Sequence, residues 1–82
     1  MKIDGETEYK TKDLGESSAI VISGQKIIDI RRDGKVCWFI FDDAEKCEEI
    51  SREYFFGNLQ GSLRNYNETM GILKNRIFSN VR

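Results

Sequence analysis

The chain has 82 residues, which predicts one small domain with a modest hydrophobic core. It contains no histidine, and this counts against zinc sites of the Cys/His type and against histidine-based acid–base catalysis. Thirteen basic and fourteen acidic residues leave a net charge of -1, so there is no overall attraction to nucleic acid. We therefore expect a protein that is not an enzyme and that uses no metal and no cofactor.

The compartment follows from what the sequence lacks. No apolar run has the length of a membrane span, and the polar start "MKIDGETEYK" has no apolar segment of a secretory signal. Cys37 and Cys47 have no metal-ligand spacing. A disulfide between them is conceivable, but two reduced, buried thiols suit a chain without a secretory signal better. The expectation is a cytoplasmic protein with no membrane partner.

The first quarter of the chain is the most ambiguous. Residues 1–10 are polar and predict a flexible N-terminal arm, followed by a single small α+β domain over residues 11–82. In residues 12–23, Thr11 is suited to cap a helix and Gly24 to end one. The β-branched run "SAIVIS" instead favours a strand that turns into "QKIIDI". The pattern alone leaves both alternatives open.

The next segment predicts a β-hairpin. Asp33-Gly34 is the preferred pair for a type I′ two-residue turn, and this turn would place Arg32 opposite Lys35 and Ile30 opposite Cys37. The face expected to cover the core then carries Ile28, Ile30, Cys37, Phe39 and Phe41. The other face, which would be polar if it met water, carries Ile27, Val36, Trp38 and Ile40, interrupted by Asp29 and Arg31.

Two helices are predicted after the hairpin. Asp42 at the N-cap with Glu45 three residues later resembles a capping box, and Gly57-Asn58 ends that helix. Ser62 can cap the last helix. Its apolar stripe consists of Leu63, Tyr66, Met70, Leu73 and Ile77.

Several short motifs occur in a familiar order. They are "TKDL", "SG", "RRDGKVCWFIFDD", "EKCEE", "EYFFG" and "LKNRIF". Over residues 11–79 the chain resembles a family of small bacterial and phage proteins classed as domain of unknown function 5659. The resemblance implies a helix over residues 12–23, and the family offers no catalytic residues to carry over to this chain. The resulting fold class is an antiparallel β-hairpin packed against helices in the order α-β-β-α-α. The alternative is a three-stranded antiparallel meander followed by two helices.

The second hairpin face is the predicted functional surface. Burying its four apolar side chains would contribute about 6 kcal/mol, so something is expected to cover it. One alternative is that the first helix covers it within the same chain, making three layers. The other is that it binds a protein partner through Ile27, Asp29, Arg31, Val36, Trp38 and Ile40.

We therefore predict a small accessory protein that acts by binding another protein. The resemblance implies a phage or mobile-element inhibitor of host machinery, of the anti-defence type, in a bacterial or phage-infected cell. One alternative is a structural homodimer, whose partner is a second copy. The other is a nucleic-acid-binding module, for which the candidate residues are Arg31, Arg32, Lys35, Lys74 and Arg76.

Overall fold

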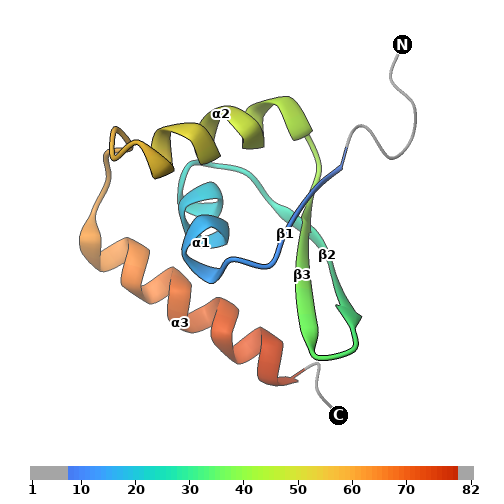
Figure 1. The fold of residues 1–82 in the computed structure, drawn as a ribbon. Coiled ribbons are helices and arrows are strands. Elements are labelled where there is room, and N and C mark those ends of the chain that lie inside the picture. The colour runs from blue at the N-terminus through green and yellow to red at the C-terminus, as the bar shows by residue number, and fades with distance from the viewer. Residues whose placement is uncertain (1–7, 80–82) are drawn as a thin grey trace.

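A computed structural model of the chain describes residues 8–79 and shows a mixed α+β fold (Figure 1). The elements are β1 (Tyr9–Thr11), α1 (Leu14–Ile22), β2 (Ile27–Asp33), β3 (Val36–Phe41), α2 (Ala44–Phe55) and α3 (Leu63–Ser79). The three strands form one antiparallel sheet in the order β1-β3-β2, with β3 in the centre. The order β-α-β-β-α-α shows that the predicted order α-β-β-α-α was wrong.

The missed element is β1. Its three residues pair with β3, Tyr9 opposite Phe41 and Thr11 opposite Phe39. A strand this short has no recognisable period, and it is stabilised by pairing with a strand some thirty residues later in the chain, as the register shows. Residues 1–7 of the predicted arm lie outside the described residues, while its last two residues belong to β1.

The ambiguous segment is a helix, so the alternative of a three-stranded meander in sequence order is wrong too. Asp13, not Thr11, is the N-cap, and its Oδ1 accepts a hydrogen bond from the Glu16 backbone N–H at 2.8 Å. The small residues Ser17, Ser18 and Ala19 are fully buried, so α1 packs closely against the rest of the fold. Close packing of small side chains outweighs the weak helix propensity of this segment.

The hairpin turn differs from the predicted one by one residue. Asp33 pairs with Val36, so the two turn residues are Gly34 and Lys35. Gly34, with a φ of 63°, holds the first central position, which suits a type II′ turn. Arg32 therefore lies opposite Cys37 and Ile30 opposite Phe39. On β3, the residue opposite each of these two positions lies two places further along than predicted. Side chains alternate between faces with a period of two, so the residues keep their predicted faces.

A β-bulge at the start of β2 does change faces. The register shifts between Ile27 and Asp29, which leaves Ile28 as the extra residue opposite the regular strand β3. Ile27 pairs with Phe41 and packs against the core, and Ile28 is 51% exposed. Strict alternation along the strand had placed Ile28 in the core and Ile27 on the other face. One inserted residue exchanges them.

The two C-terminal helices begin close to the predicted positions. The N-cap of α2 is Asp43, not Asp42, and its Oδ1 accepts from the Lys46 backbone N–H at 3.2 Å. Asp43 reaches this position with a left-handed backbone, at a φ of 33°. Ser62 Oγ accepts from the Asn65 backbone N–H at 3.2 Å, as expected of a cap for α3.

The core lies on one face of the sheet. All three helices contribute to it, and its buried members are Ile20, Phe39, Phe41, Cys47, Ile50 and Leu73. Figure 1 shows α1 between α2 and α3, beside the sheet. In the part of the chain that the structure describes, the helices therefore share the Phe39–Phe41 face, and the predicted three-layer alternative, with α1 on the opposite face, is wrong.

The bulge makes a prediction about stability. We expect Ile27→Ala to lower the free energy of unfolding by about 2 kcal/mol, because a core contact of a branched side chain is lost. We expect Ile28→Ala to change it by less than about 0.5 kcal/mol, because Ile28 is exposed. Urea denaturation of the two variants measures both values. The reverse order of the two effects would show that β2 is regular and not bulged.

Candidate functional site

The helix-free face of the sheet is formed around the central strand β3. Val36, Trp38 and Ile40 project to this face, since they alternate with the core residues Cys37, Phe39 and Phe41. Trp38 is partly exposed, whereas Ile40 is fully buried. A shallow hollow with a volume of about 620 Å³ lies here. It is lined by Lys10, Arg31, Arg32, Asp33, Trp38 and Ile40.

Charged side chains surround Trp38 on this face. The Lys12 ammonium lies 5.9 Å from the centroid of the indole ring, at the distance of a cation–π contact. Arg31 Nε donates to Asp29 Oδ2 at 3.0 Å, and Arg31 Nη2 lies 3.4 Å from Glu8 Oε2. Asp29 first and Glu8 second raise the pKa of the Arg31 guanidinium.

The Arg31 side chain crosses the central strand. Arg31 belongs to β2 and Glu8 directly precedes β1, and these two strands flank β3 on opposite sides. Ile40 lies between Asp29 on β2 and Lys10 on β1 in the register of the sheet. The ion pair therefore spans the face beside Ile40, and long charged side chains in this position shield apolar surface with their stems.

The structure brings five of the six predicted partner-binding residues together on this face. They are Asp29, Arg31, Val36, Trp38 and Ile40. Ile27 is separated from them, because the bulge turns it to the core face. Glu8, Lys10 and Lys12 also belong to the site. The sequence interpretation missed Glu8 and Lys10 because it treated residues 1–10 as an arm, and it missed Lys12 because it assigned this residue to the ambiguous segment 12–23. The alternation in "YKT", with Lys10 between two core-facing residues, was the only signal available.

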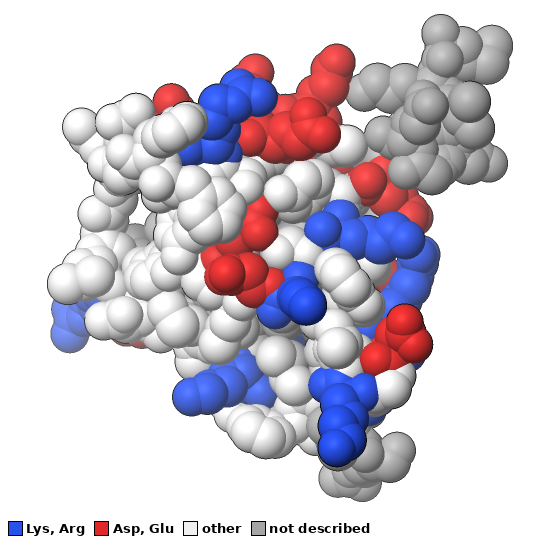
Figure 2. All heavy atoms as spheres, viewed as in Figure 1, with Lys and Arg blue, Asp and Glu red and all other residues white. Residues whose placement is uncertain are grey.

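The predicted nucleic-acid residues do not form one surface. Arg31 and Arg32 both line the hollow beside Trp38, and Arg32 Nη1 also donates to Cys37 Sγ at 3.3 Å. Lys35 is in the turn at one end of β2, and Arg76 of α3 lines a hollow with Ile27 at the other end. Lys74 is exposed on α3. Figure 2 shows basic and acidic side chains mixed over the sheet, and acidic side chains with a few basic ones along α2.

A second candidate is the buried carboxylate of Glu16, in the first turn of α1. Glu16 is only 5% exposed and accepts hydrogen bonds from the Tyr9 hydroxyl and, at 2.6 Å, from Thr11 Oγ1. Burial of Tyr9 and its hydrogen bond to Glu16 raise the pKa of the Tyr9 phenol to about 12. Both donors come from β1 and the acceptor comes from the first turn of α1. The cluster therefore joins the first strand to the first helix, and it is closed to a substrate.

The cysteines offer no nucleophile. Both are free thiols, and both are buried. Burial, together with the negative charges of Asp43 and Glu16, raises the pKa of Cys47 to about 11. A thiol needs a lowered pKa and exposure to react at neutral pH, so the environment of Cys47 is the opposite of a catalytic one.

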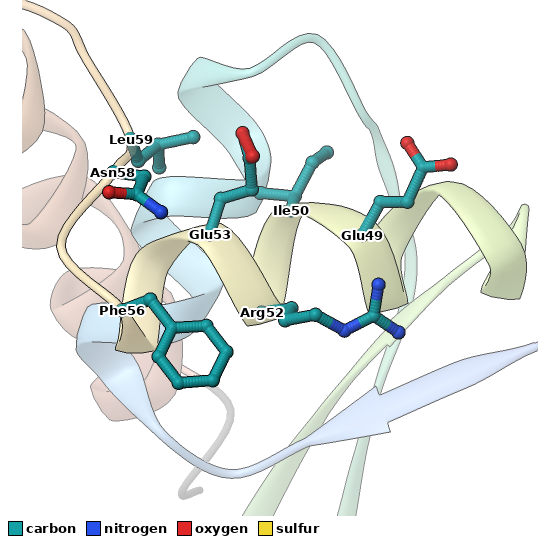
Figure 3. Close-up of a pocket in the computed structure, with 7 residues that line it drawn as sticks. All are labelled: Glu49, Ile50, Arg52, Glu53, Phe56, Asn58 and Leu59. Carbon is teal, nitrogen blue, oxygen red and sulfur yellow. The ribbon is translucent and has the colours of Figure 1, made fainter.

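A third hollow, of about 410 Å³, lies beside the end of α2 (Figure 3). Figure 3 shows Glu53 of α2 on the side that faces Leu59, while Phe56 points away from them. Its polar groups do not converge on one point, so the hollow has no constellation for binding chemistry.

Residues 8–79 contain neither a metal-binding cluster nor a membrane-spanning helix. No group of three or more Cys, Asp or Glu side chains there is arranged to hold a metal ion. No helix among these residues has the length and apolar character needed to cross a membrane.

The chain was compared with known proteins by family model, sequence and structure. No family model, no curated protein and no solved structure matches it. The resemblance to domain of unknown function 5659 therefore stays a prediction, and the site must be interpreted from its own geometry.

The Tyr9–Glu16 hydrogen bond predicts an alkaline loss of stability. The folded-state pKa of Tyr9, about 12, lies above the ordinary value of 10.0, so the folded chain holds this proton more tightly than the unfolded chain. The stabilisation is complete below pH 10 and is lost as the pH rises to about 12. We expect Tyr9→Phe to cost about 1–3 kcal/mol at pH 7 and to flatten this part of the pH profile.

The measurement is urea denaturation of both proteins between pH 7 and the alkaline limit. Equal pH profiles for wild type and Tyr9→Phe would show that the phenol does not hold the buried carboxylate.

Proposed function

We propose that this protein acts by binding another protein through the helix-free face of its sheet. The observation that supports this most directly is the position of Trp38. It is a partly exposed aromatic side chain in the central strand, and the described helices all pack on the other face. Tryptophan and arginine beside each other are the residues most often found at the energetic centre of protein interfaces.

The charge on this face favours a protein over a nucleic acid. Lys10, Lys12, Arg31 and Arg32 lie on or beside this face together with Glu8, Asp29 and Asp33, so the face carries both signs. The Arg31 guanidinium is already engaged by two of these carboxylates. A phosphate backbone needs an excess of unengaged cations, whereas mixed charges around an aromatic centre are the usual rim of a protein interface.

The cellular setting is part of the same proposal. The proposed setting is a cytoplasmic accessory protein without enzymatic activity. The raised pKa of the buried Cys47 and the histidine-free sequence support the non-enzymatic part of this proposal. The narrower role, an inhibitor or modulator encoded by a phage or mobile element, is supported by the family resemblance alone.

The first test removes the aromatic centre. We expect Trp38→Ala to weaken binding of the partner about 30-fold, corresponding to about 2 kcal/mol, because a desolvated aromatic side chain is lost. The measurement is affinity capture from the native host with quantitative mass spectrometry, followed by titration of the enriched protein. Lys12→Glu leaves the indole in place and reverses the charge beside it, and it should also weaken the binding of the same partner.

Phe56→Ala is the matched control. Phe56 is also an exposed aromatic residue, at 72%, but it lies after α2 and away from the sheet. Its removal should leave the capture unchanged. A partner lost with Phe56→Ala and retained by Trp38→Ala would place the interface at the end of α2 instead.

The nucleic-acid alternative has its own test. Trp38 is the only tryptophan of the chain, so its fluorescence reports on this face. We expect a single-stranded oligonucleotide to leave the emission unchanged at low salt, since the cations are offset by carboxylates. Quenching that disappears as salt is added, and that is weaker in Arg31→Ala, would instead favour the nucleic-acid alternative.

A further inference from the structure

The outer edge of β2 is an unused hydrogen-bonding surface. Among the residues that the structure describes, β2 pairs on one side only, with β3. It is seven residues long, and Figure 1 shows it on the side of β3 away from β1. All its residues except Ile27 and Ile30 are exposed. A long edge strand of this kind is a template for a further strand.

The hairpin decides which backbone groups face this edge. A two-residue turn makes Asp33 and Val36 a hydrogen-bonded pair, so Arg31 and Asp33 direct their N–H and C=O groups toward β3. Ile30 and Arg32 then direct theirs outward. The outward Ile30 N–H is capped by its neighbour, since it donates to Asp29 Oδ1 at 2.8 Å, while Arg31 Nε holds the other oxygen of that carboxylate.

We propose that the β2 strands of two copies of this chain pair antiparallel at this edge, with Ile30 opposite Ile30 of the second copy. In a pair with two-fold symmetry one residue must lie opposite itself, so the choice of that residue defines the register. Ile30 is the midpoint of Ile27–Asp33, so this register sets the two β2 strands opposite each other, with the bulge residue Ile28 of each copy facing Arg32 of the other. The two three-stranded sheets become one sheet of six strands.

Charge complementarity selects this register. With Ile30 at the axis, Asp29 of each copy lies opposite Arg31 of the other, on the same face of the sheet. The neighbouring registers are repulsive, because one sets Asp29 against itself. The other sets Arg31 against itself and Asp29 against Asp33. Opposite charges directly across an antiparallel pair are stabilising and like charges destabilising.

The intrachain cap is exchanged on pairing. The Ile30 N–H leaves Asp29 Oδ1 and donates to the Ile30 carbonyl of the second copy. The freed carboxylate keeps an arginine partner, since Arg31 of the second copy lies opposite it. The pairing uses the backbone edge of β2, whereas the proposed protein-binding function uses the face around Trp38; Asp29 and Arg31 belong to both, so Trp38→Ala tests the face alone.

The competing role of these features is edge protection. A bulge and charged residues on an edge strand also occur in proteins that stay monomeric. Sedimentation equilibrium of the wild-type chain over a wide concentration range separates the two. We expect a monomer–dimer equilibrium of moderate affinity, since seven paired residues make a small interface. A wild-type monomer at all concentrations would overturn the proposal.

Charge exchange tests the register itself. Asp29→Arg sets cations against each other at both cross-strand positions, and Arg31→Asp sets carboxylates there. We expect each variant alone to raise the dimer Kd about tenfold to hundredfold. An equal mixture of the two variants should form a heterodimer, because every Asp29→Arg chain then faces complementary carboxylates. Neither variant has the intrachain Asp29–Arg31 pair, so recovery in the mixture reports the contact between copies.

Glu48→Arg is the matched control, with the same change of charge on an exposed position of α2. It should dimerise like the wild type. Far-UV circular dichroism confirms that each variant is folded. Dimerisation that is insensitive to both single variants, or a mixture that stays monomeric, would show that the β2 edge is not the contact.

Discussion

Burial of Phe39 and Phe41 against the helices is the interaction on which the rest of the structure depends. Both rings are fully buried, and both lie in the central strand. Ile20 of α1, Cys47 of α2 and Leu73 of α3 meet them from one side. In so small a chain this contact forms the centre of the one hydrophobic core that the described residues build. All three helices therefore pack on one face, and the opposite face carries Val36, Trp38 and Ile40 of β3 surrounded by charged side chains.

The polar interactions support this arrangement and do not replace it. Glu16 lies in the first turn of α1. The Tyr9 and Thr11 hydroxyls donate hydrogen bonds to its carboxylate and hold β1 against this helix. Gly15, next to Glu16, leaves room for two phenol oxygens, because a Cβ at this position would lie 2.5 Å from Tyr54 Oη and 2.8 Å from Tyr66 Oη. These two tyrosines come from α2 and α3, so the absence of one side chain lets three helices meet.

The helix-free face and the β2 edge of the sheet share the same charged side chains. Both are built around the group formed by Asp29 and Arg31, with Glu8 reaching it from the other side of the sheet. On the face this group lies beside Trp38, and at the edge it caps the Ile30 N–H. The Arg31 and Asp29 side chains are about half exposed, so water also solvates them. Burying them against a partner costs desolvation, which new ion pairs with that partner must offset.

The sequence by itself determined the elements with a clear period or turn. The alternation in Val36–Phe41 placed Trp38 and Ile40 on one face and Phe39 and Phe41 on the other, and a shift of the turn by one residue left these faces unchanged because both partners moved together. Ser62 as a helix cap is likewise a local matter, decided by one hydroxyl and a backbone N–H.

Only the tertiary structure decided the rest. The three residues of β1 become a strand because β3 offers a free edge. Residues 14–22 become a helix because their small side chains fit between α2 and α3. The bulge at Ile28 exchanged the faces of two neighbouring isoleucines, which no alternating pattern could indicate. The candidate site gained Glu8, Lys10 and Lys12 in the same way, because pairing across the sheet brought a distant segment beside Trp38.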